Sequence, residues 1–189
     1  MTIRRIGLIV GAVSLLGVAG CGGPSPARHS VPVSFSGGFV IGPDDYGRPV
    51  PLYAAMLGVS PDVFRRAFAG VRPDAAHAPS GAEQQTNKAA LMRVLAAYGV
   101  GNDRLDEVAN HYRFDSTRGQ TWPQRAARAV AVVDGGTVVA IRILDPGVGY
   151  TRPPAVTVPG YPGTTLAATV AFTTDFATNG HISAVTTQR

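Results

Sequence analysis

Residues 103–111 hold the densest group of side chains in the chain that could do chemistry. Asp106, Glu107 and His111 are candidate metal ligands, since Glu107 and His111 are four residues apart and would share a helix face. A bound divalent ion could activate water for hydrolysis, but a metal site needs more ligands than one such pair supplies. The alternative is a solvated helix face with acids near its N-terminus, where the helix dipole favours them.

A second polar group lies among turn-forming residues at 42–49. Asp44, Asp45 and Arg48 could bind a sugar or an ion. The alternative is a structural turn in which an aspartate bonds to nearby backbone amides and Arg48 forms an ion pair. A divalent-ion-dependent hydrolase would have to combine this turn with the 106–111 group, and sequence does not give the separation of the carboxylates.

The aromatic residues Tyr112 and Trp122 fall between the two halves of the chain, together with Phe114. Exposed, their rings could stack on a sugar and form part of a ligand-binding surface. Alternatively, they seal the junction of two substructures, because aromatic side chains bury a large apolar area.

Other catalytic arrangements are missing from the sequence. A Gly-x-Ser-x-Gly nucleophile elbow is absent. The remaining histidines, His29, His77 and His181, fall in a Pro/Ser-rich stretch, a connection and a terminal strand, where no third group orients them. We therefore assign no catalytic residue and expect no cofactor.

The first half of the folded chain has helical periodicity. A short helix is expected over 52–57, and Ser60-Pro61 begins another that ends at Gly70. A longer one covers 82–98, and a last one, capped by Asn102 or Asp103, runs to about Tyr112.

After Gly119 the pattern changes to strands. Apolar, often β-branched runs are expected to form strands at 129–133, 137–144, 155–158, 166–173 and 181–187. Asp134-Gly135-Gly136 predicts a hairpin between the first two, and Val139 is expected on the same face as Ile141 and Ile143. The predicted class is α+β: a helical subdomain at 37–118, then an antiparallel β unit of about five strands at 119–189.

The first 20 residues have the features of a signal peptide. Arg4 and Arg5 precede an apolar run that is too short to span a bilayer, which takes about 20 residues. Val18-Ala19-Gly20-Cys21 resembles the lipobox of bacterial lipoproteins, and Cys21 is the only cysteine. An ordinary secretory signal is the alternative.

The lipoprotein resemblance implies cleavage before Cys21 and attachment of acyl chains such as palmitate to it. The chain would then be exported and lipid-anchored to a bacterial membrane, the outer one if the organism has two. Residues 21–36, rich in Gly, Pro and Ser, are expected to form a flexible tether. The mature chain has 15 basic and 12 acidic residues, too mild a charge to indicate nucleic-acid binding.

Gly147-Val148-Gly149-Tyr150-Thr151-Arg152-Pro153-Pro154 resembles a Gly-x-Gly-Tyr-x-x-Pro-Pro β repeat of bacterial surface and phage-tail-like proteins. Its glycines would permit positive φ in a turn that the tyrosine covers, and its prolines would precede a strand. Stretches within 45–113 are similar to uncharacterised exported bacterial proteins, a resemblance that implies no activity.

The leading hypothesis is a non-catalytic envelope module that binds a glycan, a cell-wall component or a protein partner. The alternatives are the divalent-ion-dependent hydrolase, which would use Asp44, Asp45, Asp106, Glu107 and His111, and a purely structural spacer.

Overall fold

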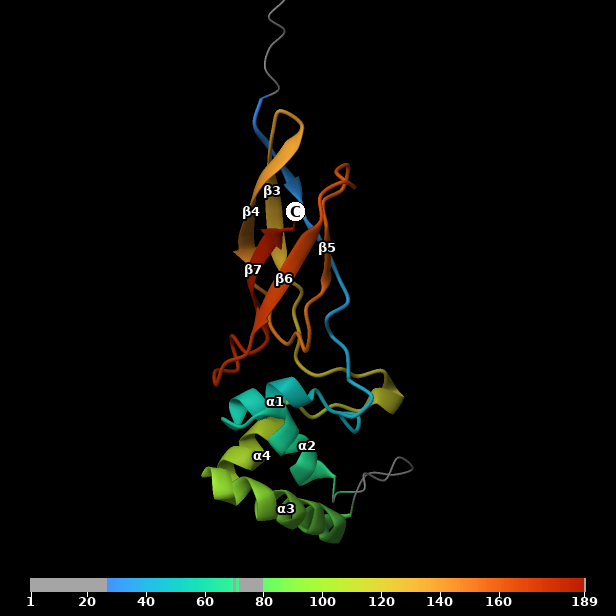
Figure 1. Ribbon diagram of the computed structural model, residues 1–189. Coiled ribbons are helices and arrows are strands. Elements are labelled where there is room, and N and C mark those ends of the chain that lie inside the picture. Colours follow the sequence, from blue (N-terminus) through green and yellow to red (C-terminus); the bar gives the residue numbers. More distant parts are fainter. Residues whose placement is uncertain (1–26, 70, 72–79, 189) are drawn as a thin grey trace, which may run out of the picture.

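A computed structural model describes residues 27–69, 71 and 80–188. The fold is α+β, as predicted, with the helices gathered at one end and the strands at the other (Figure 1). The predicted signal peptide, Cys21 and the connection containing His77 lie outside the described residues. No helix in the described part of the chain is long and apolar enough to cross a membrane.

The helices follow the predicted periodicity closely. They are α1 (Val50–Met56), α2 (Pro61–Phe68), α3 (Gly81–Leu95), with a 3-10 turn at Ala96–Tyr98, and α4 (Asn102–His111). Ser60 caps α2 as expected by accepting a hydrogen bond from the Val63 amide. Ser80 and Glu83 form a capping box at the start of α3. The cap predicted for α4 is wrong, because its N-cap is Gly101, with no side-chain bond.

The five predicted strands are all present and pair antiparallel. In chain order they are β3 (Arg128–Asp134), β4 (Thr137–Asp145), β5 (Ala155–Thr157), β6 (Leu166–Ala171) and β7 (His181–Thr187). β3 pairs with β4, and β6 pairs with β7. A 3-10 turn at Ser116–Arg118 precedes the β unit.

The flexible tether predicted over 21–36 is wrong for its last part. β1 (His29–Pro32) pairs antiparallel with β3, and β2 (Ser34–Ser36) pairs antiparallel with β5. Buried Val33 joins them and donates its amide to the Ala129 carbonyl. A segment that precedes the helices therefore completes the β unit. The edges of β3 and β5 form backbone hydrogen bonds with this segment. The composition of residues 21–36 does not predict these bonds, because their partners are distant in the sequence.

The β3–β4 hairpin turns at the predicted place, where Gly135 and Gly136 both have positive φ. The predicted position of Val139 on the face of Ile141 is wrong. Val133 pairs with Val138 and Val132 with Ala140, so Val139 is the extra residue of a β-bulge and is 53% exposed.

The segment around Tyr150 packs as its pattern predicts. Gly147 and Gly149 have φ of 66° and 85°, and Tyr150 is fully buried against the Phe39 ring, with centroids 4.2 Å apart. The Tyr150 hydroxyl accepts a hydrogen bond from the Ala127 amide at 2.9 Å. Burial raises the pKa of Tyr150, and this hydrogen bond opposes the rise.

Candidate binding site at the junction of two cores

The predicted metal ligands on α4 are each engaged with neighbouring residues. The Asp106 carboxylate binds Lys88 at 2.6 Å, and the Glu107 carboxylate binds Arg104 at 2.6 Å. The His111 ring packs on Phe176, with ring centroids 4.0 Å apart. Burial lowers the pKa of His111, and the Glu107 charge partly opposes this.

The acids required for the hydrolase hypothesis do not converge. Asp44 is exposed, whereas Asp45 is buried and paired with an arginine of α2. In the described part of the chain, no group of three or more His, Cys, Asp or Glu residues could hold a metal ion. The expected combination of Asp44 and Asp45 with Asp106, Glu107 and His111 is therefore wrong as a site.

The buried apolar residues form two clusters, a helical core made by α1 to α4 with the residues that follow, and a β core inside the β unit. Tyr112 and Trp122 belong to the helical core and not to a binding surface. They are 2% and 5% exposed. The Trp122 indole donates to the Gly149 carbonyl at 2.9 Å, so it ties this core to the Tyr150 turn. The structure follows the alternative prediction, in which these aromatics seal the junction.

Asn179 is the central polar residue of that junction and is fully buried. Its amide nitrogen donates to the Leu52 carbonyl and the Tyr112 hydroxyl, both at 2.9 Å, and its oxygen accepts from the Thr173 amide. One side chain thus satisfies polar groups of α1, the end of α4 and the β6–β7 connection. Buried polar networks of this kind fix a single arrangement when every member is bonded.

The turn at residues 42–48 is built around Asp45, which is 4% exposed. Its carboxylate accepts from the Gly42 amide at 3.0 Å, as the alternative prediction of a structural turn requires, and from Arg65 at 2.9 Å. Burial lowers the pKa of Arg65, but hydrogen bonds and charges from Asp45 and then Asp62 raise it overall. Arg65 is therefore a permanent cation held by two acids.

Arg48 forms no ion pair with an acid among the described residues, so the predicted ion pair is not found there. Its guanidinium lies over the Phe68 ring, 4.9 Å from the centroid, a favourable cation–π arrangement. Its Nε atom and the Tyr53 hydroxyl are buried, with no hydrogen-bond partner among the described residues. Arg48 thus covers the helical core next to the turn.

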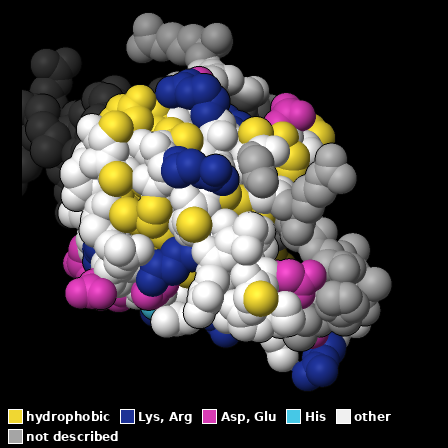
Figure 2. Space-filling model, turned by 90° about the horizontal axis from the view of Figure 1, so that it is seen from below, with side chains coloured by type: hydrophobic (Ala, Val, Ile, Leu, Met, Phe, Trp, Pro, Cys, Tyr) yellow, Lys and Arg dark blue, Asp and Glu magenta, His cyan; other side chains and the backbone are white. Residues whose placement is uncertain are grey.

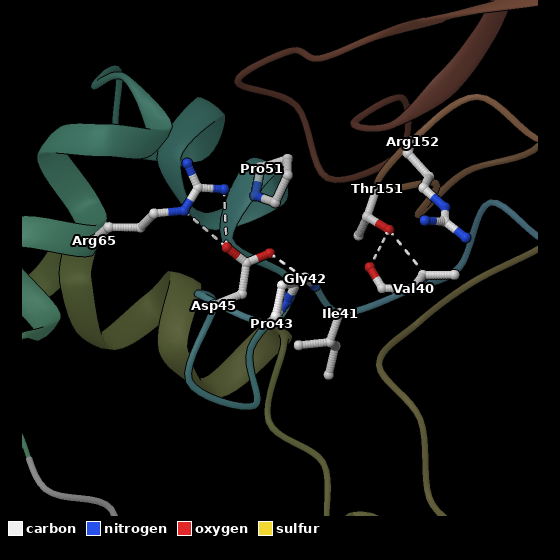
Figure 3. A pocket seen from close by; sticks show the side chains of 9 residues that line it. All are labelled: Val40, Ile41, Gly42, Pro43, Asp45, Pro51, Arg65, Thr151 and Arg152. Carbon is white, nitrogen blue, oxygen red and sulfur yellow. Dashed lines mark hydrogen bonds and ion pairs between the residues drawn. The ribbon is translucent and has the colours of Figure 1, made fainter.

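A pocket of about 250 Å³ opens where this turn meets the β unit. It is lined by residues from three segments, namely Val40, Ile41, Gly42, Pro43, Asp45, Pro51, Arg65, Thr151 and Arg152. Arg65 and Asp45 lie on one side of the pocket, and Thr151 and Arg152 lie on the other (Figure 3). The lining comes from the segment before α1, from α1 and α2, and from the turn after Tyr150, so the pocket exists only when the helical part and the β unit are packed together.

Thr151 fixes the β side of the pocket to the segment before α1. Its hydroxyl accepts from the Val40 amide at 2.9 Å and lies 2.6 Å from the Val40 carbonyl, to which it can donate. The backbone amides of Thr151 and Arg152 both donate to the Gly38 carbonyl. The pocket walls are therefore joined by hydrogen bonds and not by apolar contact alone.

Arg152 is the one lining cation without a compensating acid among the described residues. It is exposed at the pocket, and its guanidinium makes no ion pair or hydrogen bond with another described residue. Arg65, in contrast, is neutralised by Asp45 and Asp62. The pocket thus offers a partly apolar floor and one uncommitted guanidinium, which suits a carboxylate or phosphate group.

No protein-family model, curated protein or solved structure significantly matches this chain.

Sequence reasoning found one of the polar lining residues, Asp45, and missed three. Arg65 lies 20 residues further along in α2, and Thr151 and Arg152 lie more than 100 residues away. The sequence feature that could have indicated Thr151 and Arg152 is their position directly after Tyr150, in a turn that was predicted to pack against the rest of the fold.

Proposed function

We propose that this chain is an exported lipoprotein, anchored to a bacterial membrane through acylated Cys21, whose folded part is a non-catalytic binding module. The junction pocket is its ligand site. The ligand is an envelope component with an anionic group, such as a carboxylate-bearing cell-wall saccharide.

The observation that carries this proposal is the contrast between committed and uncommitted charges. Four of the five groups that the hydrolase would use, Asp45, Asp106, Glu107 and His111, are paired or packed, whereas Arg152 lines the pocket and forms no ion pair with a described residue. Pockets with a few fixed polar groups and an apolar lining are typical ligand sites.

The anchor supports an envelope ligand specifically. Two or more acyl chains give stable membrane attachment, whereas one chain is marginal. A protein held in this way meets cell-wall material and other envelope proteins and does not meet nucleic acid. If the organism has two membranes, we expect the outer one as the destination.

A matched pair of sugars tests the ligand class. N-acetylmuramic acid carries a carboxylate that N-acetylglucosamine lacks, so it should raise the melting temperature of residues 21–189 carrying Cys21→Ser, while the neutral sugar should not. A ligand that binds only the folded state at about a hundredfold excess over Kd stabilises it by about 2.7 kcal/mol. Equal shifts with both sugars would refute the role of the guanidinium. A shift with Zn²⁺, Mg²⁺ or Ca²⁺ alone would favour an ion-dependent function.

A further inference from the structure

The chain enters the fold at one end of the molecule, opposite the helices. His29, the first residue of β1, pairs with Val133 beside the β3–β4 turn. Arg28 binds Asp134 at 2.6 Å, and the Tyr161 hydroxyl of the β5–β6 connection lies 3.2 Å from the His29 ring nitrogen. We call the surface formed by residues 28–29, 134–137 and 161 the hairpin end; it lies at the top of Figure 1, with the helices at the bottom.

The length of chain between the proposed lipid and this end is short. Arg28 follows Cys21 by seven residues. A fully extended chain covers at most about 3.6 Å per residue, so Arg28 cannot lie more than about 25 Å from the acylated cysteine. The hairpin end must therefore stay close to the lipid headgroups.

The pocket and the helices lie progressively farther away. β1 and β2 take the chain from His29 to Ser36, and the pocket lining begins at Val40. Eight residues of extended strand cover about 26 Å at about 3.3 Å each, so the pocket is roughly one strand length beyond the hairpin end, and α3 is farther still (Figure 1).

The charges of the hairpin end indicate what holds it there. Arg28 and Asp134 neutralise each other, so the surface lacks the net positive charge that attracts anionic headgroups. Proximity to the bilayer then depends on the acyl chains, and the same residues without lipid should not bind vesicles.

The opposite end has the mixed surface expected of one exposed to solvent and partners. Seen from the helical end, small hydrophobic areas alternate with Lys and Arg side chains and with acids (Figure 2). Tyr98, after α3, is 52% exposed.

We propose that the hairpin end faces the bilayer and that the pocket and the helical end are held away from it, toward the cell wall or the periplasm. This orientation rests on the proposed lipid anchor at Cys21. The partner that lies next to the hairpin end is the lipid bilayer itself.

Energy transfer to labelled lipid measures this orientation. Because Cys21 is the only cysteine and is acylated in the mature protein, an introduced cysteine supplies a single free thiol. Thr137→Cys at the hairpin end and Ala89→Cys on α3 are both substitutions of small, exposed residues. Each lipidated mature variant, residues 21–189, is labelled with a donor dye and placed in phosphatidylethanolamine–phosphatidylglycerol vesicles containing a headgroup-labelled acceptor.

The expected result is clearly higher transfer from position 137 than from position 89. Equal or reversed efficiencies in vesicle-bound protein would overturn the orientation and leave the anchor intact. The mass of the mature protein and its flotation with vesicles test the anchor separately. An unmodified Cys21, or a Cys21→Ser variant that floats as well as the wild type, would overturn the anchor and the orientation with it.

Discussion

The two cores of this molecule are built from different side chains. The helical core contains large rings in mutual contact, with Tyr53 5.2 Å from Phe64 and 5.4 Å from Tyr112 between centroids. The described β core is made mainly of alanine and valine, and Tyr150 is the only aromatic among its buried residues. The helical core therefore gains much of its stability from the apolar area of large side chains, and the β core from close approach of backbones.

The difference predicts where each core is sensitive. Close approach in the β core depends on glycines that leave no room for a side chain: a Cβ atom at Gly149 would lie 2.5 Å from the Pro123 carbonyl oxygen. The helical core depends on rings and on the few polar groups between them. Substitutions chosen at these two kinds of position separate the cores experimentally.

The largest effect is expected for Gly180→Ala. Its φ is +73°, and an added Cβ would lie 2.4 Å from the Tyr150 carbonyl oxygen and 2.7 Å from Leu52 Cδ2. Left-handed strain and overpacking together should lower the free energy of unfolding by about 4 kcal/mol. Gly160→Ala is the matched control, because its φ is +84° but nothing lies within 4 Å, and it should cost about 1 kcal/mol. Equal losses in urea titrations would refute close packing at Gly180.

An intermediate effect separates two buried tyrosines of the helical core. Tyr112→Phe removes a hydroxyl bonded to Asn179 and should cost about 1 kcal/mol. Tyr53→Phe removes a buried hydroxyl that makes no hydrogen bond of normal geometry with another described residue, so it should cost less than Tyr112→Phe. The order of the two melting temperatures checks this, and a larger loss for Tyr53→Phe would contradict the assigned hydrogen bonds.

The smallest effect is a pH dependence at the edge of the helical core. Burial lowers the pKa of His111, so in mildly acidic solution the unfolded state binds more protons at this position than the folded state. Its contribution to stability is then present above the unfolded value of about 6.5 and is lost as pH falls through the lower folded value. The melting temperature should fall more for the wild type than for His111→Gln between pH 7.5 and 5.5. An equal fall of the melting temperature in both proteins would show that His111 does not cause the pH dependence.

Sequence patterns predicted most of the elements because these depend on local periodicity. Helices α2 and α3 and strands β3 to β7 lie within a few residues of their expected bounds. The N-terminal strands were missed because glycine, proline and serine dominate the composition, although Val31, Val33 and Phe35 alternate as in a strand. Their pairing depends on edges of β3 and β5 that are distant in sequence.

The candidate site was harder to predict because it depends on contacts between remote segments. Asp45 was predicted as a candidate because it lies in a turn, but its place in the site depends on its ion pair with Arg65. Arg152 has no distinguishing local pattern, and its importance comes from lining a pocket whose other wall is supplied by residues 40–51 and by Arg65. The α4 acids formed the densest polar group in sequence, yet Lys88 and Arg104 pair with two of them.

The most direct test of the proposed function is a titration of N-acetylmuramic acid into residues 21–189 carrying Cys21→Ser, with the wild-type pocket and with two arginine variants. Arg152→Ala removes the uncommitted cation at the pocket, whereas Arg142→Ala removes an exposed arginine on β4 that does not line it. We predict that calorimetry detects binding to the wild type and to Arg142→Ala, and that Arg152→Ala weakens it at least tenfold, which corresponds to about 1.4 kcal/mol. Equal affinities in all three proteins, or no binding to any of them, would contradict a carboxylate-binding site in the junction pocket.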